Sequence, residues 1–222
     1  YGYAVMAARF RGYGTGQRPS DYQPGAGRAW EIAPVSDGTA VKRDVVRWYV
    51  TQFDKNMQKL QDQAAARSAA DERTLVRDLI AQQGAALVTF RQGSSGHAVT
   101  AYGYQDLPGG GIKLAIYDPN LPYTAAEQTS KVARTDALTR GSLTIAADGS
   151  WSGSSLGWKG DNASLRVIAN IPPLDAKLPN DFSLTSVFGS SGGTPPATIT
   201  QIETGGRPQL DSGGAPNPGS PV

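Results

Sequence analysis

The only histidine of the chain, His97, and the carboxylate of Asp118 are the residues that the sequence best places to do chemistry. His97 is the second residue of the segment 96–104, Gly-His-Ala-Val-Thr-Ala-Tyr-Gly-Tyr. The pattern of this segment predicts a β-strand that starts at His97. A second apolar strand, residues 112–117, follows a glycine-rich turn and ends at Asp118. A carboxylate at that position can accept the proton of one ring nitrogen, which fixes the tautomer and leaves the other nitrogen as a base. We therefore expect the two side chains to lie within hydrogen-bonding reach of each other.

No nucleophile accompanies this pair within the chain. The sequence contains no cysteine, and no serine stands in a recognisable nucleophile motif. The run Asp118-Pro119-Asn120 also fits a purely structural turn, because Asp and Asn bond their own backbone and proline presets φ. Asn120 is the alternative partner for the histidine. The placement of His97 and Asp118 at the ends of neighbouring strands favours a functional pair over two unrelated structural residues.

Composition indicates an ordinary protein domain. The 222 residues are 39% hydrophobic and carry a formal net charge of +2. Lys and Arg are scattered, without the basic block that a nucleic-acid-binding protein shows. No apolar run approaches the roughly 18 residues that a membrane span needs. We expect no disulfide, no metal and no cofactor, and the absence of cysteine says little about the compartment.

Helices are predicted to dominate residues 1–83. Residues 1–11 show helical spacing of their apolar side chains, and residues 17–38 are expected to form a long surface loop. A single apolar stripe runs from Val41 to Leu60 and predicts one helix there, with a frayed continuation or an end in the polar residues after it. A third helix is expected over residues 70–83, with Glu72 on its solvated face.

Strands are predicted in the remainder of the domain. The expected strands are residues 85–90, 97–104 and 112–117, with weaker ones at 142–147 and 164–171. Trp151 and Trp158 are assigned to packing. Residues 189–222 are rich in Gly, Pro, Ser and Thr and predict a disordered linker or tail.

The order of these elements, helices first and then an antiparallel sheet carrying His and Asp, resembles the papain-like cysteine peptidases. In that superfamily the nucleophilic cysteine stands at the N-terminus of a central helix, in a Cys-Trp-Ala-Phe-Ser run that alternates aromatic and small residues. The chain opens Tyr1-Gly2-Tyr3-Ala4, and this resemblance places the cysteine immediately before Tyr1. A second register puts Ala4 in the cysteine position, as in an inactivating substitution, but Val5 then occupies the aromatic position.

The downstream residues are similar to bacterial peptidases related to the bacteriocin-processing family. Their shared pattern is His-x-Val-x-x-Tyr-Gly-Tyr, a polar turn, an apolar strand and Tyr-Asp-Pro-Asn. The resemblance implies that His97 is the general base and acid and that Asp118 orients its ring, with Asn120 as the possible substitute. The oxyanion donor of the family is a glutamine before the cysteine, so it has no counterpart in the chain.

The resemblance implies an α+β papain-like domain over residues 1–188, with a helical half (1–83) packed on an antiparallel sheet half (84–188). Its implied activity is thiol-dependent hydrolysis of a peptide or related amide in a peptide or protein substrate. Residues 1–222, which lack the thiol, are expected to be inert by themselves. A non-catalytic papain-like binding module stays open, as does an acyltransferase or transglutaminase with the same triad order.

The setting of the domain is also an expectation. A chain that starts at Tyr1, without a visible signal peptide, suggests a trimmed or processed end. We expect the domain to be part of a longer multidomain polypeptide, secreted or at the cell surface of a bacterium.

Overall fold

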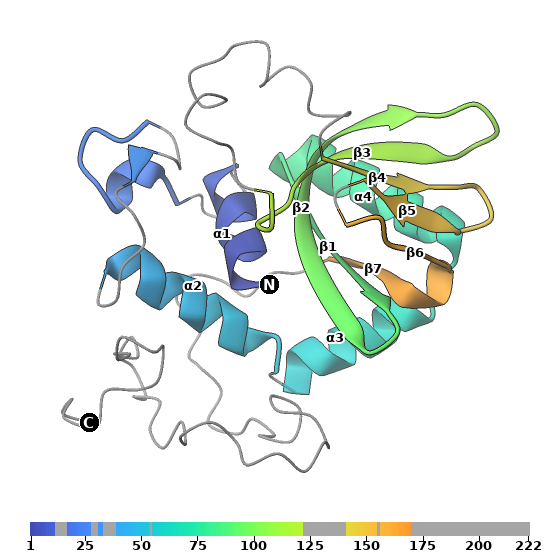
Figure 1. The fold of residues 1–222 in the computed structure, drawn as a ribbon, viewed down its shortest axis with the longest axis horizontal. Helices are drawn as coiled ribbons and strands as arrows, with labels where there is room; N and C mark the ends of the chain where they lie inside the picture. Colours follow the sequence, from blue (N-terminus) through green and yellow to red (C-terminus); the bar gives the residue numbers. More distant parts are fainter. Residues whose placement is uncertain are drawn as a thin grey trace.

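Helices precede strands along the chain in the computed structural model (Figure 1). The structure describes residues 1–11, 17–27, 31–32, 39–53, 55–121, 141–154 and 156–169. The helices are α1 (Gly2–Phe10), α2 (Ala40–Thr51), α3 (Lys55–Ala65) and α4 (Ala69–Gln83), with short 3-10 turns η1 (Pro19–Asp21) and η3 (Asn162–Ser164). The strands are β1 (Ala86–Gln92), β2 (Ser95–Asp106), β3 (Ile112–Tyr117), β4 (Ser142–Ile145), β5 (Trp151–Gly153), β6 (Lys159–Gly160) and β7 (Leu165–Ile168).

The seven strands form one antiparallel sheet in the order β6-β5-β4-β3-β2-β1-β7. The sheet curls until it is nearly closed, and the backbone N–H of Lys159 in β6 donates to the side-chain oxygen of Gln92 in β1 at 3.3 Å. Strands β1 and β2 lie near the middle of the hydrophobic core, where Leu87, Val88 and Val99 are fully buried. The expected α+β class, with helices before an antiparallel sheet, is confirmed.

Helix α1 lies between α2 and the sheet (Figure 1). At its start, Gly2 packs so tightly on α2 that a Cβ atom there would lie 2.1 Å from the carbonyl oxygen of Val45. At its end, the carbonyl oxygen of Arg11 would lie 2.7 Å from a Cβ at Gly84, whose φ of +74° also favours glycine. The close packing of α1 on α2 therefore explains why a glycine stands at position 2.

The single helix predicted over residues 41–60 is wrong, because the chain forms two helices there. Helix α2 ends at Thr51, whose hydroxyl donates to the carbonyl oxygen of Trp48 at 2.7 Å. That bond competes with helix continuation, and Val50 and Thr51 are both β-branched. The stripe persists across the break because Trp48 in α2 and Met57 in α3 are both buried in the core.

The third predicted helix is confirmed as α4, which begins at a Ser68–Asp71 capping box and ends at the left-handed Gly84. The assignment of Glu72 to its solvated face is wrong. Glu72 is fully buried, because its carboxylate accepts the backbone N–H of Val167 at 2.9 Å and the side-chain Nε–H of Arg67 at 3.2 Å. The carboxylate thereby satisfies a backbone donor on the outermost strand, β7.

All five predicted strands are present, as β1, β2, β3, β4 and β7; the bounds of β3 are the predicted ones, and the other four have shifted ends. Strands β5 and β6 were not predicted, because segments of three and two residues are too short to show a period. The predicted tail, residues 189–222, and the domain boundary at residue 188 lie outside the described residues. Within the described part of the chain, no helix has the length and apolar character that crossing a membrane requires.

Candidate active site

His97 lies near the start of β2, opposite Phe90 of β1 in the strand register. Paired residues of neighbouring strands point to the same face, so the two rings meet. They are edge to face, with centroids 5.5 Å apart. The imidazole is 11% exposed, which leaves it at the margin of the core and accessible from outside.

Asp118 follows the last residue of β3 and contacts this imidazole. Its Oδ1 lies 2.8 Å from Nε2 of His97, the contact expected from the sequence, and its side chain is 1% exposed. The register explains the meeting: β2 pairs with β3 only from Thr100, opposite Tyr117, onward. Beside the earlier residues of β2, strand β3 has already ended, and the turn that follows it brings the carboxylate to the histidine.

The turn itself holds the carboxylate in place. The backbone N–H of Asn120 donates to the same Oδ1 of Asp118 at 2.8 Å, and the N–H of Leu121 donates to the Asp118 carbonyl at 2.9 Å. The structural and the functional interpretation of the Asp-Pro-Asn run are therefore compatible. Asn120 contributes a backbone donor to Asp118, and the carboxylate is the group that meets the imidazole.

Aromatic rings surround the pair on the sheet side. Trp158 packs edge to face with His97, with centroids 6.2 Å apart, and with Phe90 at 6.0 Å. Trp151 packs on Phe90 at 4.9 Å and is 3% exposed, as the packing assignment expected. Trp158, also assigned to packing, additionally contacts the imidazole. The sequence offered no signal for this contact, because Trp158 precedes the very short strand β6.

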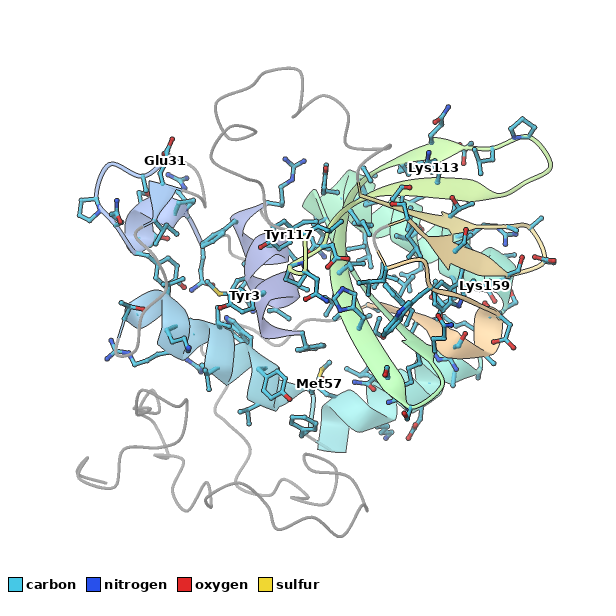
Figure 2. The ribbon with its side chains drawn as sticks, viewed as in Figure 1. Tyr3, Glu31, Met57, Lys113, Tyr117 and Lys159 are labelled. Carbon is cyan, nitrogen blue, oxygen red and sulfur yellow. The ribbon has the colours of Figure 1, made fainter. Side chains whose placement is uncertain are left out.

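The first turn of α1 reaches the sheet at the point where β3 ends. The hydroxyl of Thr100 in β2 donates to the carbonyl oxygen of Ala4 at 2.5 Å, and both residues are fully buried. The side chains of Tyr3 and Tyr117 lie at the junction of α1 and the sheet (Figure 2). Burial raises the pKa of Tyr117, and the neighbouring Tyr3 and Asp118 raise it further.

The start of α1 is enclosed as well. Tyr1 is the N-cap residue of the helix, and burial lowers the pKa of its α-amino group below the ordinary value of 8.0. A helix N-terminus favours negative charge, since its first N–H groups point along the axis without intrahelical partners. Ala4, the cysteine position of the second register, is 0% exposed.

The arrangement of His97 and Asp118 defines what the imidazole can do. A carboxylate on Nε2 favours the tautomer that carries its proton there, so Nδ1 holds the lone pair and can take a proton from another group. Among the described residues, Nδ1 makes no further hydrogen bond. In the same part of the chain, no three His, Asp or Glu side chains gather closely enough to hold a metal ion.

Comparison of the chain with protein-family models, with curated proteins and with solved structures found no match.

Proposed function

We propose that His97 and Asp118 are the base and the orienting acid of a papain-like thiol hydrolase, which cleaves a peptide or related amide. The nucleophile of this proposal is a cysteine immediately before Tyr1 in the intact protein. The observation that carries the proposal is the 2.8 Å contact between Nε2 of His97 and Oδ1 of Asp118. A largely buried carboxylate on one ring nitrogen, with the other nitrogen left as a base, is the arrangement that general-base catalysis requires.

Two further observations support a nucleophile at the start of α1. The first turn of this helix is bonded to β2 through Thr100, which follows His97 by three residues along the strand. The helix N-terminus stabilises a thiolate there, as does a protonated imidazole. Gly2, the first residue of the helix, is buried, which supports a nucleophile that attacks from a site shielded from bulk water.

The proposed reaction proceeds through an acyl-enzyme. Nδ1 of His97 takes the thiol proton, and the thiolate attacks the carbonyl carbon of the amide. The imidazolium then gives that proton to the departing amine, which leaves the acyl group on sulfur. Water, deprotonated by the same nitrogen, breaks the thioester and restores the thiol. Asp118 keeps its charge throughout and stabilises the imidazolium.

The test uses a chain extended by one cysteine before Tyr1. Residues 1–222 contain no cysteine, so alkylation by iodoacetamide reports this single thiol. We expect rapid alkylation near neutral pH, because the thiolate forms below the free-thiol pKa of about 8.5. His97→Ala should slow the reaction sharply at neutral pH, and Asp118→Asn should slow it to a lesser degree.

A chain extended by one serine is the matched control and should take up no label. An ordinary exposed-thiol pH profile that is indifferent to His97→Ala would overturn the proposal. The residue encoded before Tyr1 in the gene is an independent check. A residue other than cysteine there would favour a non-catalytic binding module.

A further inference from the structure

We propose that Thr100 is a positioning residue, which sets the first turn of α1 against the His97–Asp118 pair. The inference deepens the proposed function and rests on it. Thr100 touches neither the imidazole nor the carboxylate in the structure; it acts through the helix.

Thr100 occupies the junction of the two halves of the domain. Thr100 is the first residue of β2 that pairs with β3, and its partner is Tyr117, the last residue of β3. Asp118 directly follows Tyr117. On the other side, the Thr100 hydroxyl donates to the carbonyl oxygen of Ala4 in α1 at 2.5 Å. One residue therefore fixes both the strand end that presents Asp118 and the helix that would present the nucleophile.

The bond is unusual in its setting. Within an α-helix the carbonyl of Ala4 already accepts the N–H four residues later, so the helix itself does not need the Thr100 hydroxyl. Both residues are fully buried. A buried hydroxyl without a partner is costly, so this donor is retained together with its acceptor.

Two close backbone contacts of α1 involve elements other than β2. Gly2 fixes the distance to α2 through the backbone of Val45, and Arg11 meets Gly84 at the far end of the helix. Rotation of α1 about its axis, or a slide along it, would change the placement of the residue before Tyr1. Among the described hydrogen bonds, the one from Thr100 joins the first turn of α1 to the sheet. Reaction rates are sensitive to displacements of this kind, since about 1 Å can cost a hundredfold.

The test measures thiol alkylation against pH in the cysteine-extended chain. Thr100→Val removes the hydroxyl but places a methyl group near the Ala4 carbonyl, so Thr100→Ala provides a second variant without that crowding. We expect both variants to slow alkylation at neutral pH about tenfold. Their pH profiles should shift toward that of an ordinary thiol. Thr100→Ser keeps the donor and should behave like the parent.

A second readout uses the chain as it stands. Hydrogen exchange of the α1 amides should become faster in Thr100→Ala than in Thr100→Ser, while the α4 amides stay unchanged. This measurement does not depend on the thiol, so it separates the two ideas. A His97-dependent parent profile that neither Thr100→Ala nor Thr100→Val alters would overturn the positioning role alone. A parent profile indifferent to His97 would overturn the proposed function, and the positioning role with it.

Discussion

The side chains of His97 and Asp118 are 21 residues apart in the sequence and meet at 2.8 Å, Nε2 to Oδ1. They meet because β2 extends past the end of β3, and the turn after β3 fills the space beside the longer strand. The backbone N–H of Asn120 donates to the same carboxylate oxygen, which holds Asp118 in place. The longer strand β2, the shorter strand β3 and the turn after β3 thus fix the orientation of the His97 imidazole.

Trp158 should limit access to this base. Its ring packs edge to face with the imidazole, so Trp158→Ala should expose the imidazole and speed modification by diethylpyrocarbonate several-fold. The sole histidine makes the absorbance change specific to His97. Trp158→Phe retains an aromatic ring and should react at nearly the wild-type rate. Equal rates in Trp158→Ala and the wild type, with unchanged melting temperatures, would show that this ring does not cover the imidazole.

Gly2 should be intolerant of a side chain. A Cβ atom there would lie 2.1 Å from the carbonyl oxygen of Val45, so Gly2→Ala must displace α1 from α2. We expect the free energy of unfolding to fall by about 1–3 kcal/mol, as overpacking in a core typically costs, in a denaturant titration. Gly103→Ala is the control, because its Cβ would meet Ala115 at an ordinary 3.7 Å. Similar stability of the two variants would contradict the tight packing of α1.

Glu72 should make stability depend on pH. Burial raises the pKa of its carboxyl above the ordinary value of 4.5, although Arg67 and the N–H of Val167 act in the opposite direction. The folded protein therefore binds this proton more tightly than the unfolded chain. The stabilisation from Glu72 is complete below pH 4.5 and is lost as the pH rises through the raised pKa.

The comparison with Glu72→Gln isolates this group. The free energy of unfolding of the wild type, relative to Glu72→Gln, should decrease from pH 4.5 upward and then level off. Denaturant titrations across this range measure the difference. A difference that instead grows with pH would mean that the ion pair with Arg67 outweighs burial.

The sequence was most informative where a feature is local. Gly84 marks the end of α4, and apolar strands joined by a glycine-rich turn are enough to place His97 near Asp118. Helix α2 was predicted too long because its apolar period continues into α3, while the break coincides with a hydroxyl bond of Thr51 to the backbone.

Other features depend on distant parts of the chain. Glu72 looks like a surface residue of an amphipathic helix, and only the position of β7 explains its burial. The contact of Trp158 with His97 joins residues far apart in sequence, and nothing in the surrounding residues indicates it. The bond between Thr100 and Ala4 is of the same kind, since it spans the two halves of the domain.

The protonation state of the single imidazole tests the central claim most directly. A long-range ¹H–¹⁵N correlation spectrum at pH about 9, where a histidine is neutral, distinguishes the protonated from the unprotonated ring nitrogen. We expect the wild-type protein to show Nε2 protonated and Nδ1 unprotonated, because Asp118 accepts from Nε2. Asp118→Ala should give a mixture of the two tautomers, while Asn120→Ala, which keeps the backbone donor, should match the wild type. A proton on Nδ1 in the wild type, or a spectrum unchanged by Asp118→Ala, would contradict the assignment of His97 as an oriented base.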